Sequence, residues 1–291
     1  MQNPLIGYYQ NGNYVVKFYQ NGTKIKKTNE DKFIAKFPDS IDLKITDYCD
    51  KNCPMCHEKS SILGLHGDLN EEFLKTLKRG TELAIGGGNP LSHPNLEEFL
   101  KEMKARGVIC SLTVNGDHLI ADNGHIEALI KDKLIYGLGI SIQKYNQKVV
   151  DFAQKYPNAV LHLINGIFTD FDKLFDKNLK ILILGYKKFG KGEHFYSNEV
   201  ESNMLNLKHN VSSYLERFNV ISFDNLALLQ LDVKSFLSNE DYESIFMGND
   251  GDSSMYIDLV KKQFAKSSTS VERYPLGKDI FEMFSKINNN K

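Results

Sequence analysis

Short apolar runs alternate with amphipathic stretches over most of this chain, and this alternation constrains its fold more than any other feature. Apolar residues such as Leu96, Phe99 and Met103 recur at the spacing of one helix face. Strands that alternate with such helices are typical of a parallel sheet. The sequence therefore predicts an α/β fold, in which the strands are Asp42–Thr46, Glu82–Gly86, Val108–Val114, Leu134–Ile142, Ala159–Ile164 and Lys180–Leu184.

The first 36 residues follow a different pattern. Asn11-Gly12 and Asn21-Gly22 repeat at a spacing of ten residues, between runs rich in Tyr, Val and Phe. Asn-Gly favours a tight hairpin because both residues tolerate the positive φ of a type I′ turn. Residues 1–36 are therefore predicted to form a three-stranded antiparallel meander. Such a sheet either covers the bottom or edge of the main domain or offers an edge strand to an extended peptide.

The last part of the chain mixes helical and strand patterns. Apolar residues step by three or four positions along Glu199–Phe218, which predicts a long helix. Met255–Val260, followed by a turn through Lys261-Lys262, predicts a hairpin. No Pro/Gly/Ser-rich linker or whole-domain repeat interrupts the chain. We therefore expect one domain, with a core over residues 37–196 and an α+β extension over residues 197–291.

Composition excludes several classes of protein. Hydrophobic residues make up 41% and charged residues 25% of the chain, which disfavours disorder, collagen-like repeats and coiled coil. Lys and Arg total 36 against 37 Asp and Glu, so no global field attracts nucleic acid or acidic membranes. No apolar stretch reaches the roughly 18 residues of a membrane helix, and the N-terminus lacks a signal-peptide pattern. A cytoplasmic protein is expected, with neither membrane nor nucleic acid as partner.

Three of the four cysteines crowd into eight residues directly after the first core strand. Cys49, Cys53 and Cys56 have the spacing C-x3-C-x2-C, and four cysteines are too few for a disulfide framework. Cysteine thiolates hold iron–sulfur clusters, and a complete cubane usually has four of them. Three ligands would leave one iron open to a non-protein ligand. Cys110, inside the third predicted strand, is expected to be a small buried hydrophobe.

This cysteine loop after the first strand resembles the cluster loop of the radical SAM superfamily. The resemblance implies a 4Fe-4S cluster held by Cys49, Cys53 and Cys56, with S-adenosylmethionine (SAM) chelated at the fourth iron. It implies reductive cleavage of SAM to a 5′-deoxyadenosyl radical, which abstracts hydrogen from a peptide or small-metabolite substrate in an oxidoreductase or lyase reaction. Flavodoxin or ferredoxin is the expected electron donor. The implied fold is a partial (β/α)6 TIM-type barrel, with the extension closing its open side.

Further positions match the SAM-binding pattern of this family. Gly87-Gly88-Asn89-Pro90 is similar to the family's Gly-Gly-Glu-Pro motif, with Asn89 keeping an acceptor but losing the charge. Glycines there would let main-chain carbonyls approach the methionyl ammonium. Polar groups at strand ends would contact the ribose and carboxylate, and a methionine before the last cysteine would pack near the adenine. The residues implied to bind SAM are Met55, Gly87, Gly88, Asn89, Pro90, Asn115, Ser141 and Gly185.

The residues leave alternatives open. Zinc could bind the three cysteines together with His57 or His66 in a Cys3His site, and a non-catalytic iron–sulfur or zinc protein would then use its edge strands to bind a partner. A ferredoxin-like carrier is disfavoured because no fourth cysteine is placed to complete a cluster. A radical SAM enzyme that modifies a nucleotide or nucleic acid is a further alternative. His162 is either a substrate contact or a core histidine, and Lys187–Lys191 either grips an anionic ligand or is a solvated loop.

Overall fold

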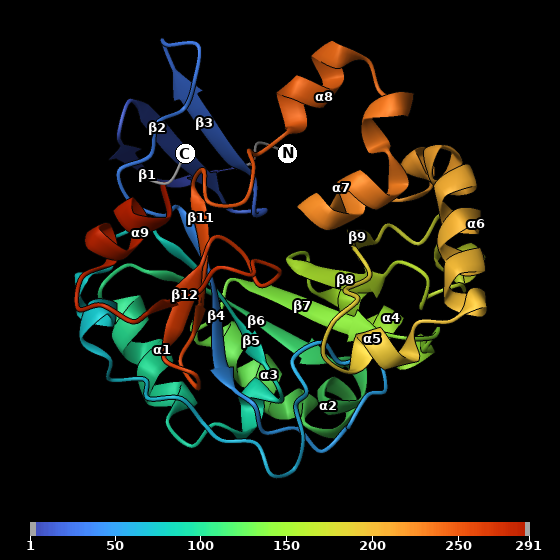
Figure 1. Cartoon of the computed structure of the whole chain (residues 1–291), viewed down its shortest axis with the longest axis horizontal. Helices are drawn as coiled ribbons and strands as arrows, with labels where there is room; N and C mark the ends of the chain where they lie inside the picture. The colour runs from blue at the N-terminus through green and yellow to red at the C-terminus, as the bar shows by residue number, and fades with distance from the viewer. Residues whose placement is uncertain (1–3, 289–291) are drawn as a thin grey trace.

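The computed structural model describes residues 4–288, so the first three residues of the predicted meander segment and the last three of the predicted extension lie outside the described residues. It contains a three-stranded and a ten-stranded sheet. The small sheet stands above the large one at the upper left of the molecule (Figure 1). It is the predicted antiparallel meander, formed by β1 (Leu5–Asn11), β2 (Tyr14–Tyr19) and β3 (Lys24–Thr28).

The large sheet has the strand order β10-β9-β8-β7-β6-β5-β4-β11-β12-β13, and neighbouring strands from β10 to β11 run parallel. All six predicted core strands are present, which confirms the α/β fold class. The strands are β4 (Ser40–Thr46), β5 (Glu82–Gly87), β6 (Ile109–Asn115), β7 (Gly137–Ile142), β8 (Ala159–Ile164), β9 (Lys180–Leu184), β10 (Val220–Phe223), β11 (Ser254–Asp258), β12 (Gln263–Ala265) and β13 (Tyr274–Pro275).

The C-terminal extension adds strands to both sides of the core. β10 pairs with β9, while β11 pairs with β4 and forms the predicted hairpin with β12. In the described part of the chain β10 and β11 do not pair with each other, so the barrel stays open between them. The extension therefore borders the opening without strand pairing across it, and its closure of the open side stays a prediction. The predicted domain boundaries themselves stay a prediction.

Helices follow most of the core strands and cover the outside of the sheet (Figure 1). In residues 4–288 no helix combines the length and apolar content that a membrane crossing requires. The helices, with short 3-10 turns labelled η, are η1 (Glu72–Thr76), η2 (Pro90–Ser92), α1 (Leu96–Ala105), α2 (Gly116–Ala121), α3 (Asn123–Lys131), α4 (Gln147–Lys155), η3 (Phe171–Leu174), α5 (Lys191–Phe195), α6 (Asn198–Tyr214), η4 (Leu215–Arg217), α7 (Asn225–Leu231), η5 (Val233–Phe236), α8 (Asn239–Ile245) and α9 (Ile280–Asn288).

Two predicted elements differ most in their bounds, while three other core strands differ by one or two residues at an end. The strand expected over Leu134–Ile142 begins only at Gly137, because Lys133 takes a left-handed φ of 53° and the Leu134 N–H donates back to Leu129 at the end of α3. The helix expected over Glu199–Phe218 is divided into α6 and η4. Both differences arise where the chain turns. The backbone hydrogen bonds of such turns do not change the spacing of apolar residues, so the sequence pattern does not reveal them.

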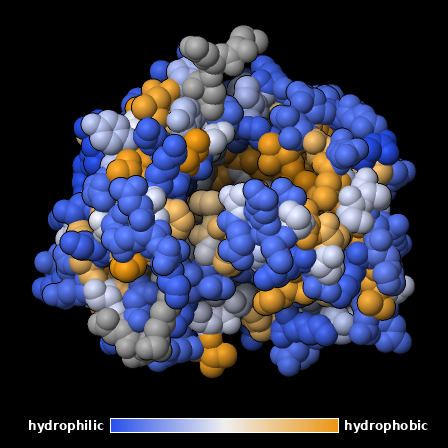
Figure 2. Space-filling model, turned by 90° about the horizontal axis from the view of Figure 1, so that it is seen from above, coloured by the Kyte–Doolittle hydropathy of each residue, from blue (hydrophilic) through white to orange (hydrophobic). Residues whose placement is uncertain are grey.

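The two faces of the core strands differ in burial. Outward side chains such as Leu43 and Leu161 are fully buried among the helices, whereas inward ones such as Asp42 and His162 keep part of their surface exposed. Since successive residues of a strand point to opposite faces, this alternation marks a packed outer face and an inner face around an open lumen. Seen from above, the molecule is hollowed near its middle, and hydrophobic side chains gather around the hollow (Figure 2).

Cys110 lies on the packed outer face of β6, as expected for a buried hydrophobe. Its side chain is 1% exposed, and burial raises the pKa of its thiol to about 12. The thiol is therefore neutral at physiological pH, and its fully buried environment differs from that of the three partly exposed motif cysteines.

The meander is fastened to the N-terminal end of the barrel by one buried carboxylate. Asp39, just before β4, accepts hydrogen bonds from the Tyr9 and Tyr14 hydroxyls over 2.7 and 2.6 Å and pairs with the Lys26 ammonium at 2.7 Å. Burial opposes its ionisation, but these partners hold the pKa of Asp39 below its usual value. Ile109 packs against the apolar side of the meander. The meander therefore covers part of that end of the barrel, as predicted.

Candidate functional site

The cysteine motif lies in the loop that follows β4, at the C-terminal end of the first core strand. The Cys49 N–H donates to the Ser61 carbonyl over 2.9 Å, which folds the loop back on itself. Asn52 takes a left-handed φ of 49° and turns the chain between the first two cysteines. Cys49, Cys53 and Cys56 are partly exposed and form no disulfide. The loop thus leaves its three thiols available to a metal.

The positions of these thiols bear on the choice between an iron–sulfur cluster and a zinc ion. Zinc–sulfur bonds of about 2.3 Å in a tetrahedron place the sulfur atoms about 3.8 Å apart. Within residues 4–288 the only group of three ligating side chains with all ligand atoms within 4.8 Å contains Cys49 but neither Cys53 nor Cys56. A cubane is held by one thiolate per iron, so wider spacing suits it. Burial raises the pKa of Cys49 and Cys53, and nearby thiolate charge adds to this, so a bound cation would stabilise their ionised forms.

Neither histidine of the zinc alternative joins the cysteines. The His57 Nε2 atom lies 3.2 Å from the Lys187 ammonium, and burial followed by that positive charge lowers the pKa of His57. The His66 Nδ1 atom lies 2.9 Å from the Thr46 hydroxyl. In this structure the alternative Cys3His site with His57 or His66 is therefore not assembled. The donor set of this loop fits an iron–sulfur cluster.

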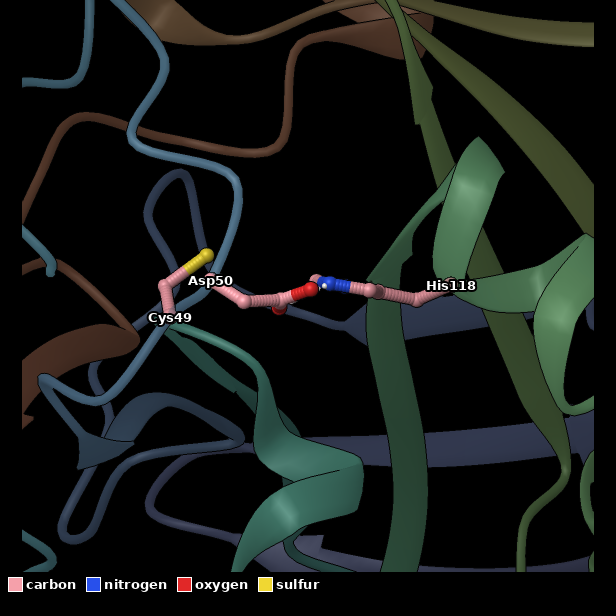
Figure 3. A group of neighbouring side chains, drawn as sticks. All are labelled: Cys49, Asp50 and His118. Carbon is pink, nitrogen blue, oxygen red and sulfur yellow. Dashed lines mark hydrogen bonds and ion pairs between the residues drawn. The ribbon is translucent and has the colours of Figure 1, made fainter. Parts of the chain in front are cut away.

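A third histidine, which was not predicted from the sequence, meets the loop from α2. Asp50 and His118 reach toward each other, beside Cys49 (Figure 3), and the His118 Nε2 atom lies 2.7 Å from the Asp50 Oδ1 atom. Partial burial opposes ionisation of Asp50, but the hydrogen bond from His118 holds its pKa below the usual value. The contact ties the loop to α2, the helix that follows the third core strand. The one feature of the sequence that could have indicated a role for His118 is its position, about one helical turn after Asn115.

Gly87 ends β5, and Gly88 follows it directly beneath the cysteine loop. The Gly88 N–H donates to the Thr46 carbonyl over 2.7 Å, and a Cβ at Gly88 would lie 2.1 Å from the Tyr48 carbonyl oxygen. Gly87 has a φ of 116°, and a Cβ there would lie 2.4 Å from the Thr46 carbonyl oxygen. The close approach of the chain's own loop therefore requires glycine at both positions. The expected approach of their backbone to SAM stays a prediction.

Gly88→Ala is expected to displace the cysteine loop and to weaken iron retention about tenfold, as loss of a supporting contact at a metal site typically does. The matched control is Gly86→Ala, because a Cβ at Gly86 meets only the Thr113 Cβ at 3.9 Å. Iron and sulfide are measured after anaerobic reconstitution and desalting, and circular dichroism reports the fold. Equal iron content in the two variants would show that the glycine does not support the loop.

The remaining residues of the glycine motif form the start of η2. The Asn89 N–H donates to the Tyr48 carbonyl over 2.6 Å, and its side-chain oxygen accepts from the Leu91 N–H over 3.2 Å. Pro90 is buried behind it. Asn89 therefore caps a short helix and braces the cysteine loop, and its contact with the cofactor stays a prediction.

Met55 and Gly185 lie where the cysteine loop meets the far side of the barrel. Met55 packs in a small apolar cluster with Tyr186. Gly185 is buried, and its N–H donates to the Asp224 carboxylate over 2.9 Å. This N–H is thus satisfied by the chain itself. The expected contacts of Met55 and Gly185 with the adenine stay predictions.

Three polar residues form a row across neighbouring strands. Asn115 of β6 pairs in register with Ser141 of β7, which pairs with His162 of β8. Register partners face the same side of a sheet, so these side chains share the inner face. A Cβ at Gly139 would lie 2.3 Å from the His162 ring, so this glycine makes room for it. No described residue hydrogen-bonds His162, and burial lowers its pKa to about 4.

A buried lysine joins the cysteine loop to the C-terminal extension. The Lys44 ammonium lies 2.6 Å from Asp47, 2.7 Å from Glu58 and 3.1 Å from Asp258, and its side chain is 2% exposed. Burial opposes its charge, but these carboxylates raise the pKa of Lys44 above the usual value. The Tyr256 hydroxyl donates to Glu58 over 3.1 Å. Sequence gave no signal for this network, because 214 residues separate Lys44 from Asp258.

The lumen carries charge of both signs near its opening. Asp42 is exposed to the lumen yet surrounded by protein, and this burial raises its pKa, with the charges of Asp250 and Asp224 adding to the effect. Lys187 opposes the shift, and its ammonium donates to the Ser268 hydroxyl over 2.8 Å. Lys191 donates to the Ser60 carbonyl over 3.1 Å. The predicted basic stretch thus braces the cysteine loop and the extension and is not a free solvated loop.

Comparison with known proteins finds similarity in structure. No family model matches the chain, and no curated protein is significantly similar to it. SuiB from Streptococcus suis bound to its precursor peptide SuiA matches with a TM-score of 0.61 and 15% identity, over 86% of this chain and 65% of that chain. SuiB bound to S-adenosylmethionine matches with a TM-score of 0.57 and 12% identity, over 86% of this chain and 64% of that one.

A further SuiB structure matches with a TM-score of 0.58 and 15% identity, over 86% of this chain and 66% of that chain. The chain thus spans slightly less than two thirds of the length of SuiB, and identity this low shows the fold alone. The parallel core strands, the antiparallel meander and the shared architecture agree with the implied barrel. The chain therefore has a fold similar to that of SuiB, which agrees with the partial TIM-type barrel that the cysteine motif implied.

Proposed function

We propose that this chain is a radical SAM enzyme that acts on a peptide. The observation that carries the proposal is the C-x3-C-x2-C loop at the C-terminal end of β4, with three unpaired thiols, in a fold shared with a protein that binds S-adenosylmethionine. The peptide is inferred from SuiB, which binds the precursor peptide SuiA. Binding sites in barrels of this kind gather at the C-terminal ends of the strands, where this loop lies.

In this proposal Cys49, Cys53 and Cys56 hold a 4Fe-4S cluster, and the glycine motif with Asn115 and Ser141 holds SAM. When bound, the cluster supplies one electron that cleaves SAM to methionine and a 5′-deoxyadenosyl radical able to take a hydrogen atom from substrate. The protein's part is to bind, orient and protect. The Asp50–His118 contact fixes the loop against α2, as a contact behind a metal ligand commonly does.

The lumen is the proposed place of the substrate. His162, neutral at pH 7 and without a hydrogen-bond partner in the described chain, faces it together with Ser141 and Asp42. These groups can bind polar parts of a peptide while the apolar lumen wall excludes water. The opening between β10 and β11 offers an extended chain access from the side. Flavodoxin or ferredoxin is the proposed source of the electron.

The test is anaerobic reconstitution with iron and sulfide, reduction with dithionite and electron paramagnetic resonance with and without SAM. We expect about four irons per chain and a cluster signal that changes when SAM is added, because SAM would bind the open iron. Mass spectrometry should then detect 5′-deoxyadenosine. Bound zinc without a cluster, or a four-iron cluster whose signal ignores SAM, would contradict the proposal.

A further inference from the structure

A groove lies at the end of the barrel opposite the cysteine loop. It has a volume of about 960 Å³ and separates β1 from the N-terminal ends of the core strands. Residues 4 and 6–9 form one wall, and the segments that lead into β7 and β8, residues 133, 135–138 and 156–159, form much of the other. We name this cavity the floor groove. The Cys49–Cys56 loop follows the C-terminal end of β4, so the groove is separate from the candidate cofactor site.

The two edges of the meander differ in a way that bears on this groove. Edge strands expose unpaired backbone groups, and proteins commonly protect them with lysine or proline. β3 follows this rule with the sequence Lys-Ile-Lys-Lys-Thr. β1 reads Leu-Ile-Gly-Tyr-Tyr-Gln-Asn, without charge or proline, and within the described chain only β2 pairs with it. The edge beside the groove is thus the unprotected one.

Four side chains of β1 are exposed, and all of them except Gln10 are apolar or aromatic. Ile6 is 50% and Tyr8 74% exposed, and both line the groove. They stand two residues apart, so they point to the same face of the strand. Single exposed apolar residues need no explanation, but an uncharged edge strand that gathers them beside a cavity is typical of a binding surface.

The charges of the groove are of one sign. Arg79 and Lys133 are the charged residues that line it, and no carboxylate does. Both are exposed, and neither forms an ion pair with any residue of the described chain. The Arg79 side chain is held close to Gly107, where a Cβ would lie 2.8 Å from the Arg79 Cγ atom. The groove therefore suits an occupant that carries negative charge as well as apolar groups.

We propose that the floor groove binds an extended peptide segment that is both acidic and apolar, added as a fourth strand along β1. Its backbone would pair with the open edge of β1, its apolar side chains would contact Ile6 and Tyr8, and its carboxylates would face Arg79 and Lys133. The choice of a peptide rests on the proposed function. The groove then serves as a docking site that holds one segment of the substrate at a distance from the candidate cofactor site.

The geometry gives this docking a length requirement. β4 has seven residues and connects the groove end of the barrel to the cysteine loop. At about 3.3 Å per residue this is about 23 Å, which an extended peptide spans with about seven residues. The docking segment and the reacting residue must therefore be separated by at least that stretch. Peptides that are shorter would bind without reacting.

The first measurement is selection of a random 12-residue peptide library, by messenger RNA display, on the immobilised wild-type protein. We expect enrichment of sequences with Asp or Glu and apolar residues at alternating positions. The dissociation constant of the most enriched peptide is then measured by fluorescence anisotropy. Arg79→Glu with Lys133→Glu should weaken binding at least about tenfold, because repulsion replaces attraction at two sites. The control Lys75→Glu with Lys148→Glu makes the same charge change elsewhere on the exposed surface and should leave binding intact.

Two further probes test the strand pairing. The same peptide with N-methyl groups at alternate backbone positions cannot donate to β1 and should bind at least about tenfold more weakly. Ile6→Lys gives the β1 edge a lysine, as the β3 edge already has. This variant should also bind the peptide at least about tenfold more weakly. Binding that survives these changes, enrichment of basic peptides or no enrichment at all would overturn the proposal. So would a dimer, seen by light scattering, that Ile6→Lys dissociates.

The response of the cluster signal to SAM separates this proposal from the proposed function. None of the altered residues contacts the cysteine loop, so the groove variants should retain that response. Loss of peptide binding with an intact SAM response would refute only the docking site. Peptide binding without any SAM response would refute only the enzyme assignment.

Discussion

Cys53→Ala should reduce 5′-deoxyadenosine formation to the background of the reaction without protein. Removing one of three thiolates would leave a cluster with two unsupported irons, and cysteine ligands are what such clusters depend on. The fold should remain, because Cys53 is partly exposed and the Gln143 amide, 3.2 Å away, is the one hydrogen-bond partner of its thiol in the described chain. Iron analysis, paramagnetic resonance and mass spectrometry of the nucleoside product measure the loss.

Cys110→Ala is the matched control for this prediction. It removes the remaining cysteine, which is 1% exposed on the outer face of β6. We expect normal cluster assembly and a modest loss of stability of roughly 1 kcal/mol, because a small buried group is removed from the core. If Cys53→Ala keeps a cluster that responds to SAM, the assignment of Cys53 as a ligand is wrong. If Cys110→Ala loses its cluster, the role of the fourth cysteine has been misjudged.

Lys44→Met should lower the free energy of unfolding by about 3–5 kcal/mol, because it leaves partly or fully buried carboxylates without their cation. Asp47, Glu58 and Asp258 all lie within 3.1 Å of the Lys44 ammonium. Methionine fills a similar volume, so the loss would report charge and not a cavity. Urea unfolding of metal-free protein, followed by circular dichroism, measures it without a contribution from cluster binding. The control Lys101→Met breaks the exposed pair with Glu97 and should cost no more than about 0.5 kcal/mol.

The effect of Lys44→Met should depend on pH. Burial opposes ionisation of Glu58, but His57 and Lys44 hold its pKa well below the usual value. A carboxyl group with a lowered pKa in the folded state contributes stability above its unfolded pKa, about 4.3, and loses that contribution as the pH falls below it. The difference between wild type and variant should therefore shrink below about pH 4.3. A difference that is below 1 kcal/mol at pH 7, or that is unchanged at low pH, would contradict the charge argument.

Local patterns were sufficient for the elements of this fold. Alternating burial defined strands such as Ala159–Ile164, whose predicted and observed bounds agree, and the Asn11-Gly12 repeat defined the meander. The cysteine spacing pointed to the barrel because it is a local feature of one loop after one strand. Strand ends were less predictable. Leu134 is apolar in either conformation, and the turn that excludes it from β7 depends on a backbone hydrogen bond to Leu129.

Contacts between distant segments were beyond the reach of these patterns. In the sequence, Lys44 is indistinguishable from an ordinary strand residue. Its ion pair with Asp258 exists because β11 pairs with β4 in the folded chain. His118 became part of the candidate site because α2 returns it to Asp50. The glycine motif was correctly placed at a strand end, but its closest neighbour proved to be the carbonyl of Tyr48.

The sequence by itself determined the meander, the six core strands and the three-thiol loop, since each depends on residues that are neighbours along the chain. Only the tertiary structure decided which charges meet in the buried network, and that within residues 4–288 one edge of the meander stays open and β10 does not pair with β11. The physical reason is the same in each case. Pairing of strands and burial of charge depend on distances between segments that lie far apart in sequence, and no local periodicity records those distances.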